Sequence, residues 1–391
     1  MKRLIILIII LIGAYTTYRL FGNDTLPKLP IENTPKISEL TPPASTDDTP
    51  LATIIAENLE VPWGIAFLPA SPDASQNRTD GQMLVTERVG RVRLIDSNFK
   101  LQEKPILILS EVQSINGEGG LHGIVLHPQF TSNNFVYIYY TYSSGGSQTL
   151  NKVERYIFDG QTLTIDKTII DKIPGSLFHD GGRIKFGPDN FLYITTGDAQ
   201  QSDLAQNTSS LAGKILRVTD EGKIPDDNPF GNAIYSYGHR NPQGIDWDDE
   251  NKLWSTEHGR SGALSGLDEV NLIKQGGNYG WPEIQGNETK DGMITPARQS
   301  GAKSTWAPAC AAVINNRMFF SGLKGEALYE TLIDGSQLVG MKEYFKNKYG
   351  RIRECIKGPD DMLYITTSNR DGRGNVQDGD DKIIRINPNK L

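Results

Sequence analysis

The sequence is poor in the residues from which many metal and redox sites are built. It has only two cysteines, Cys310 and Cys355, and five histidines among 391 residues. None of them stands at the His-x-x-x-His, Cys-x-x-Cys or His-x-Glu spacing of a zinc site. A Gly-x-Gly-x-x-Gly turn between strand and helix patterns is missing, as is a Gly-x-Ser-x-Gly elbow. These absences argue against a zinc site and a nicotinamide-binding domain.

Clustered positive charge is also absent. The net charge is −7, and no long run of Lys or Arg occurs. Because phosphate contacts need clustered cations, we expect no nucleic-acid partner.

The single long apolar run is too short for a full membrane span. It extends from Leu4 to Tyr15, between Lys2-Arg3 and Arg19. This length suits a signal-peptide core better than a span of about 20 residues, yet no clean cleavage site follows. Residues 1–22 are therefore expected to be a signal peptide or an N-terminal membrane anchor. In either case the body is exported to the periplasm or cell envelope, soluble after signal cleavage or membrane-anchored.

Residues 23–50 are rich in Pro, Thr, Ser and Asp and lack apolar periodicity. This composition predicts a disordered linker. Export would permit a disulfide between Cys310 and Cys355. Two buried free thiols are an equal alternative, because the sequence does not place the two residues near each other.

One hairpin pattern recurs through the body of the chain. Residues 184–196 and 356–367 share a strand, a Gly-Pro-Asp turn and a second strand rich in β-branched and aromatic residues. Four weaker copies bring the turn residues to positions 69, 128, 188, 249, 316 and 359, so the steps are 59, 60, 61, 67 and 43 residues.

Six strand-rich copies without a sustained helical pattern predict an all-β fold, a six-bladed β-propeller over residues 51–391. A long array of β-sandwiches is the alternative. The apolar stretch 51–56 is expected to pair beside residues 382–386 in the last blade, which would close the ring and cover two edges.

Polar residues in Gly-rich turns are the candidates for chemistry. Tyr235–Gly244 crowds an imidazole, a guanidinium and two amides between turn-forming residues, as a polar-ligand site would. His179 and Asp198 stand at the two ends of one predicted hairpin. A carboxylate on one imidazole nitrogen raises the basicity of the other, so this pair predicts a general base. A hydrogen bond that only braces a turn is the alternative.

Cations gather in the last third of the chain. Arg351 and Arg353 are spaced to face the same way on an extended segment. Together with Arg240 and Lys324 they predict a site for a small polyanionic ligand, since Arg suits carboxylates. An exposed charged rim is the alternative. Carboxylates and Gly-rich carbonyls near Glu257–Glu269 predict a hard cation such as Ca²⁺, with a solvated acidic loop as the alternative.

Nine motifs in a fixed order connect these features. They are Val61–Gly64, Gly117–Leu121, His127–Phe130, His179–Arg183, Thr196–Asp198, Gly238–Gly244, Thr256–Gly259, Asp268–Asn271 and Gly276–Pro282. Through them the chain resembles the soluble glucose/sorbosone dehydrogenase family, and within it the aldose sugar dehydrogenases, over about residues 57–387. The resemblance implies a six-bladed propeller that uses pyrroloquinoline quinone (PQQ) and Ca²⁺ to oxidise aldoses at the anomeric carbon to lactones.

The same resemblance implies roles for single residues. His179 would take the proton of the anomeric hydroxyl, and Asp198 would orient it. Hydride would pass to the quinone, with Arg240 stabilising the charge on the quinone oxygen.

The resemblance also implies the ligand sets of the cofactor and the metal. The residues implied at the cofactor, besides Arg240, are Glu118, Asn241, Lys324, Arg351 and Arg353. The implied calcium ligands are the carbonyls of Gly259 and Arg260 at the cofactor, and Glu269 with the Tyr279 carbonyl at a second, structural site.

Three departures from the family pattern concern substrate and calcium. Glu118 stands where the family often has Gln near the substrate, Arg260 replaces a usual Pro, and residues 261–266 resemble a short insertion. A calcium-dependent propeller lactonase or esterase, and a non-catalytic propeller that binds a glycan or protein, are the alternative functions. The expected partners are a small-molecule sugar and an electron acceptor that the sequence does not specify, in a monomer or homodimer.

Overall fold

The computed structural model describes residues 48–70, 81–114, 117–143, 145, 148–261 and 265–391. The predicted signal peptide or anchor, nearly all of the linker, and residues 262–264 of the insertion lie outside these ranges. No helix in the described ranges has the length and apolar composition needed to cross a membrane.

The body, residues 49–391, is built from six four-stranded antiparallel sheets, which we number as blades 1 to 6. Blade 1 contains β2 (Pro62–Phe67), β3 (Met83–Glu87), β4 (Arg91–Ile95) and β5 (Leu107–Ile108). Blade 2 contains β6 (Leu121–Leu126), β7 (Phe135–Ser143), β8 (Thr149–Phe158) and β9 (Leu163–Pro174). Blade 3 contains β10 (Ile184–Phe186), β11 (Leu192–Thr196), β12 (Lys214–Val218) and β13 (Ile234–Tyr237).

The second half repeats this plan. Blade 4 contains β14 (Pro242–Trp247), β15 (Leu253–Glu257), β16 (Glu269–Ile273) and β17 (Arg298–Gln299). Blade 5 contains β18 (Ala312–Ile314), β19 (Arg317–Gly322), β20 (Ala327–Asp334) and β21 (Gln337–Tyr344). Blade 6 contains β22 (Ile352–Lys357), β23 (Leu363–Thr367), β24 (Ile383–Ile386) and β1 (Ala52–Ala56). Short helical turns are α2 (Phe130–Asn133), η2 (Ser202–Ala205) and η4 (Pro388–Lys390).

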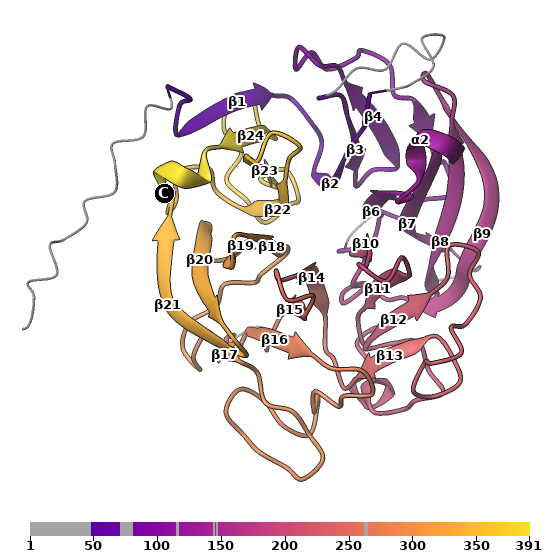
Figure 1. The fold of residues 1–391 in the computed structure, drawn as a ribbon, viewed down its shortest axis with the longest axis vertical. Coiled ribbons are helices and arrows are strands. Elements are labelled where there is room, and N and C mark those ends of the chain that lie inside the picture. Colours follow the sequence, from indigo (N-terminus) through magenta and orange to yellow (C-terminus); the bar gives the residue numbers. More distant parts are fainter. Residues whose placement is uncertain (1–47, 71–80, 115–116, 144, 146–147, 262–264) are drawn as a thin grey trace, which may run out of the picture. The chain divides into compact units, whose positions relative to one another are not determined.

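The blades form a closed ring, which confirms the predicted propeller (Figure 1). The first strands β2, β6, β10, β14, β18 and β22 contact one another in series, and β22 returns to β2. Strand β1 pairs with β24, with Ala52 opposite Ile386, so the N-terminal strand completes the C-terminal blade as predicted. Each of the six predicted turn residues lies two residues after the end of one of the first strands.

The core lies between blades rather than at the centre. Buried apolar side chains form clusters that each join two neighbouring blades, including one between blades 6 and 1. The axis itself is crossed by a buried ion pair between Arg183, before β10, and Glu354 of β22. The cavity between the first strands is lined mostly by apolar side chains, and its charged groups are Arg183, Lys185 and Glu354.

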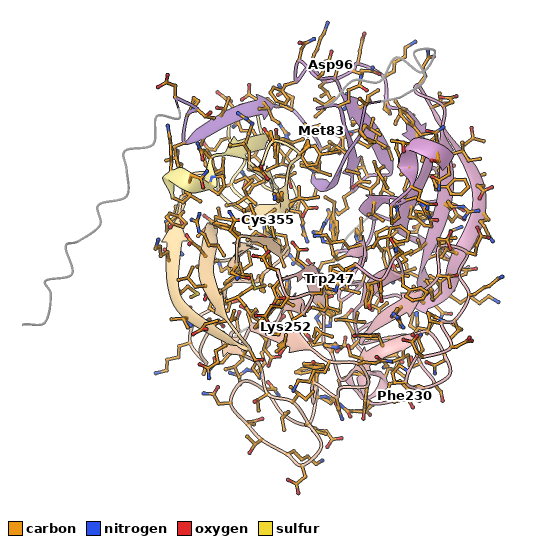
Figure 2. The ribbon with its side chains drawn as sticks, viewed as in Figure 1. Met83, Asp96, Phe230, Trp247, Lys252 and Cys355 are labelled. Atoms are coloured by element: carbon orange, nitrogen blue, oxygen red, sulfur yellow. A yellow bond between two sulfur atoms is a disulfide. The ribbon has the colours of Figure 1, made fainter. Side chains whose placement is uncertain are left out.

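The two cysteines pair. Cys310 and Cys355 form a disulfide with a Cα–Cα distance of 5.5 Å, joining the segment before β18 to β22. Figure 2 shows the side chain of Cys355 nearer the middle of the ring than Phe230 or Asp96. The bond ties blade 5 to blade 6, the blade that the N-terminal strand β1 completes.

Candidate active site

The predicted site residues lie on connections at one mouth of the ring. This mouth carries the loops that enter each first strand and the turns between the second and third strands of a blade, because antiparallel strands return to the same edge. The residues predicted on these connections are Glu118, His179, Asp198, Arg240, Asn241, Gly259, Arg260, Lys324 and Arg351, with Arg353 two residues further on, in β22.

The His179–Asp198 pair lies at this mouth, on the connections of blade 3. His179 Nδ1 lies 2.7 Å from Asp198 Oδ1, which confirms the predicted meeting of the hairpin's two ends. The His179 side chain is 15% exposed, whereas Asp198 is 2% exposed. A side chain at Gly197 would strike the His179 carbonyl at 1.9 Å, so glycine is needed for this close approach. His179 itself has φ 67°, a left-handed conformation that non-glycine residues adopt mainly at special sites.

Asp198 has a second partner that the sequence did not predict. Its Oδ2 accepts a hydrogen bond from Trp281 Nε1 at 2.8 Å. The guanidinium of Arg240 lies over the same indole ring, 5.4 Å from its centroid. Trp281 belongs to the Gly276–Pro282 motif, but its 83-residue separation from Asp198 hides the contact from sequence reasoning.

Glu118 connects the base to the opposite side of the mouth. Its Oε2 accepts the main-chain N–H of His179 at 3.1 Å, and its Oε1 pairs with Arg373 Nη1 at 3.0 Å. Burial opposes ionisation, but the His258 imidazole, the His179 N–H and Arg373 lower the pKa of Glu118 to about 2. Arg373 comes from the loop between β23 and β24 and stacks on Phe178, 5.0 Å from its centroid. Glu118 therefore carries a negative charge that the usual Gln would lack, and Arg373 is the counter-ion of this charge.

Arg240 and Asn241 are held by the main chain and by Glu257. Arg240 Nη2 donates to Ser261 Oγ at 2.9 Å and Nη1 to the His258 carbonyl at 3.3 Å. Asn241 Oδ1 accepts from Gly181 N at 3.0 Å, while Glu257 accepts the main-chain N–H of both residues. No acidic side chain among the described residues forms an ion pair with the Arg240 guanidinium.

The C-terminal cations lie at the same mouth, with unequal pairing. Arg351 forms an ion pair with Asp371 at 2.8 Å and donates to the Leu323 carbonyl at 3.1 Å. Arg353 donates to Gln243 Oε1 at 2.7 Å, but its buried Nε has no partner in the described ranges. Burial lowers the pKa of Arg353 to about 9, and the charges of Arg351 and Arg88 add to this. Lys324 is exposed, one residue after Leu323, and its ammonium group forms no hydrogen bond or ion pair with the residues that the structure describes.

Two further polar groups belong to this mouth, and neither was predicted. Arg88 follows β3, donates to the Gly117 carbonyl at 3.0 Å and buries an Nε that has no partner in the described ranges. Asp180 is buried with Oδ1 bound to Asn151 and Ser176 and with Oδ2 unpartnered there. Burial raises the pKa of Asp180 to about 7. Arg88 has no distinguishing motif, whereas Asp180 stands beside the predicted base.

The predicted calcium ligands are of two kinds, main-chain carbonyls and the Glu269 carboxylate. Gly259 donates its N–H to Asp268 at 2.8 Å, and the structure shows no hydrogen bond to its carbonyl. The Arg260 carbonyl already accepts the Gly266 N–H at 3.3 Å, so one of its two lone pairs is in use. Oxygen ligands of this kind suit Ca²⁺.

All four predicted calcium ligands, Gly259, Arg260, Glu269 and Tyr279, line one small cavity of about 20 Å³, together with Glu257. Burial, followed by the charge of Glu257, raises the pKa of Glu269 to about 8. No group of three acidic, His or Cys side chains able to hold a metal occurs in the described ranges. A cation here would therefore depend on main-chain carbonyls as well as on Glu269.

Comparison with known proteins identifies the family of the chain. The sequence model of the Glucose / Sorbosone dehydrogenase family matches residues 59–384. The PQQ-bound aldose sugar dehydrogenase of Streptomyces coelicolor shares 35% identity and a TM-score of 0.76, covering 85% of this chain and 97% of that one. The aldose sugar dehydrogenase of Escherichia coli is 29% identical over 82% of this chain and 90% of its own. Quinoprotein glucose dehydrogenase B of Acinetobacter calcoaceticus is 31% identical over 61% and 54%. The chain belongs to the glucose/sorbosone dehydrogenase family.

Proposed function

We propose that this protein oxidises aldose sugars at the anomeric carbon to lactones, with PQQ as the bound electron acceptor and with calcium. One observation carries the proposal. Buried guanidinium groups with too few anionic partners stand beside a His–Asp pair at one mouth of the ring. Arg353 and Arg88 each bury an Nε without a partner, and Arg240 lacks an ion pair in the described ranges.

Such a cation set fits a polyanionic ligand. A buried guanidinium is costly unless it is paired, and PQQ carries three carboxylates that guanidinium groups bind well. The pKa of Arg353 is lowered first by burial and further by the charges of Arg351 and Arg88, although the charges of Asp371 and Glu118 act to raise it. Arg351 already has Asp371, so Arg353, Arg240 and Arg88 are the groups with most to gain from the ligand. Asn241, with Nδ2 3.5 Å from Glu118, would border the ring.

The residues of this chain then move the proton. His179 uses Nδ1 for Asp198, which leaves Nε2 to accept the proton of the anomeric hydroxyl as the C1–H bond breaks. The chemistry that the quinone supplies is acceptance of the two electrons and the hydrogen of that bond, so that the aldose becomes its lactone. Arg240 is placed beside the pair, over Trp281, to stabilise negative charge that develops near its guanidinium.

Calcium would serve two purposes in this proposal. At the Gly259 and Arg260 carbonyls it would fix and polarise the cofactor, and at Glu269 and the Tyr279 carbonyl it would neutralise a buried carboxylate. The raised pKa of Glu269, caused first by burial, supports the second role.

We also propose that the propeller works outside the cytoplasm, where an external acceptor would reoxidise its cofactor. The Cys310–Cys355 disulfide supports this placement, because disulfides persist mainly in oxidising compartments. The choice between a cleaved signal peptide and a retained anchor is decided by sequencing the N-terminus of the mature protein.

The test is reconstitution followed by titration. Purified protein should oxidise aldoses with a dye acceptor only after PQQ and Ca²⁺ are both added. Arg353→Met should weaken PQQ binding at least about ten-fold, followed by absorbance, because a buried charge pair is lost. Arg217→Met is the matched control, since Arg217 is equally buried but pairs with Asp189 and Asp227 in blade 3. Hydrolysis of lactones without PQQ, or sugar binding without turnover, would instead establish one of the two alternative functions.

A further inference from the structure

Trp281 is fixed in place by the fold before any ligand binds. Its main-chain N–H donates to the Gly238 carbonyl at 2.9 Å, and its carbonyl accepts from Gln206 Nε2 at 2.7 Å. Gln206 and Asn278 exchange two side-chain hydrogen bonds, at 2.8 and 3.0 Å. The loop that follows β16 is thereby tied to the end of β13 and to the loop after η2, so the main chain that carries the indole is held by three segments.

The indole completes the hydrogen bonding of Asp198. Asp198 Oδ1 accepts from Gln200 N at 2.8 Å and contacts His179 Nδ1, whereas Oδ2 has Trp281 Nε1 as its partner. The Asp198 side chain is 2% exposed, so water has little access to replace a missing donor. A carboxylate fixed at both oxygens cannot rotate about its terminal bond, and this fixes the plane in which the imidazole lies.

The same ring also faces the second catalytic candidate. The Arg240 guanidinium lies over the indole at 5.4 Å, within the range of a cation–π interaction. The N–H at the edge of the indole therefore binds Asp198, the carboxylate that orients the base. The face of the same indole contacts the Arg240 guanidinium. The two groups come from different connections, after β11 and after β13, and share this one side chain.

We propose that Trp281 is a positioning residue that sets the geometry of the His179–Asp198 pair relative to Arg240. This inference rests on the proposed function and adds Trp281 as a third residue to the His179–Asp198 pair. Its effect should fall on kcat, because proton transfer depends on the direction of His179 Nε2, and only weakly on KM or PQQ affinity.

The test removes the indole N–H and keeps an aromatic ring. In the full-length protein reconstituted with PQQ and Ca²⁺, Trp281→Phe should lower kcat about ten-fold, since general-base catalysis as a whole contributes roughly 10²- to 10⁴-fold. KM for the aldose and PQQ affinity by absorbance titration should change less than about three-fold.

Trp254→Phe is the matched control. Trp254 Nε1 donates to Asp248 Oδ2 at 2.9 Å, the same bond at a buried position of β15 away from the mouth. Loss of this hydrogen bond in Trp254→Phe should lower the stability of the protein and leave kcat unchanged. A Trp281→Phe variant with kcat within two-fold of the parent protein, or with an effect confined to KM, would overturn the inference.

A second readout does not need turnover. In the apo-protein, the proton between His179 Nδ1 and Asp198 should give a far-downfield proton NMR signal, assigned by its absence in His179→Asn. Trp281→Phe should shift or broaden this signal, and Trp254→Phe should not. If the parent protein oxidises no aldose, the proposed function fails, and this signal alone then decides the role of Trp281: an unmoved signal overturns it.

Discussion

Two histidine–carboxylate pairs lie near the same mouth of the ring. They differ in whether the second imidazole nitrogen, Nε2, has a hydrogen-bond partner. His179 contacts Asp198 at 2.7 Å, and His239 contacts Glu257 at 2.9 Å, both through Nδ1. His239 is fully buried, and its Nε2 is bound to Ser236 Oγ at 2.8 Å. His179 is 15% exposed, and the structure shows no hydrogen bond of its Nε2 to any described residue. The pair that can act as a base is the one whose second nitrogen is left for a ligand.

The backbone and the surroundings separate the two pairs as well. His179 has φ 67°, a conformation that costs on the order of 1–3 kcal/mol, whereas His239 is absent from the positive-φ residues. The His239 ring stacks on Tyr279 at 4.7 Å, and Glu257 also accepts the main-chain N–H groups of Arg240 and Asn241. His239 therefore builds the loop that presents Arg240, and His179 is held in a strained conformation by its neighbours.

The largest expected effect follows from replacing His179. Asn tolerates the left-handed conformation, so His179→Asn removes the base and preserves the turn. We expect kcat to fall by roughly 10²- to 10⁴-fold, with PQQ affinity nearly unchanged. Steady-state kinetics and an absorbance titration measure the two quantities. Retention of more than a tenth of the activity would assign the base elsewhere.

Replacing His239 should affect the fold instead. His239→Gln leaves the buried Glu257 carboxylate without one of its three partners, which should lower the free energy of unfolding by about 2–3 kcal/mol. Urea unfolding measures this cost. The His239→Gln protein that folds and still binds PQQ should have a kcat within a few-fold of the parent protein. A variant that is fully stable but inactive would reverse the roles assigned to the two pairs.

Glu257 and Glu269, two carboxylates near Tyr279, differ in how they should affect the pH dependence of stability. Glu257 is paired, whereas burial and the charge of Glu257 raise the pKa of Glu269 to about 8. The unfolded chain releases this proton near pH 4, so the folded form binds more protons between about pH 4 and 8, and stability falls as pH rises. Without calcium, the melting temperature should drop by a few degrees from pH 5 to 8, and added Ca²⁺ should restore it.

In the protein without PQQ, Glu269→Gln should remove both the pH dependence of the melting temperature and its response to calcium. The exposed Glu250, changed to Gln, is the control that should keep both. An equal pH dependence in Glu269→Gln and the parent protein would mean that another group titrates, and a preserved calcium response would place the ion elsewhere.

The fold was predictable because its signals are local and repeated. The turn residues at 69, 128, 188, 249, 316 and 359 each lie two residues after a first strand, and the stretch 51–56 pairs with β24 as its apolar pattern indicates. The His179–Asp198 contact was predictable for the same reason, since one hairpin carries both residues. The six-fold repeat of the hairpin therefore shows which strand connections lie at the same mouth of the ring.

Contacts between blades were not predictable, because no local rule sets which loops of different blades touch. Trp281 reaches Asp198 over 83 residues, and Arg373 reaches Glu118 over 255. Cys310 and Cys355 come within bonding distance only because blades 5 and 6 pack side by side. The unpaired Nε of Arg353 is likewise a property of burial, which composition and spacing do not reveal.

The smallest expected effect concerns Glu118, the departure that carries an extra charge. Its partner Arg373 is 49% exposed, and ion pairs of this kind contribute about 0–1 kcal/mol. In Glu118→Gln the amide oxygen can still accept the His179 N–H, so stability should change by less than about 1 kcal/mol and sugar KM by a few-fold.

A double-mutant cycle with Arg373→Gln separates the roles of this pair. A coupling energy below about 1 kcal/mol in unfolding, with the effect of Glu118→Gln on KM retained in the Arg373→Gln background, would place Glu118 with His179 as a residue that serves the ligand. A coupling above about 2 kcal/mol would place it with Glu257 instead, as a carboxylate whose main partner is the fold, because only a desolvated pair reaches that value.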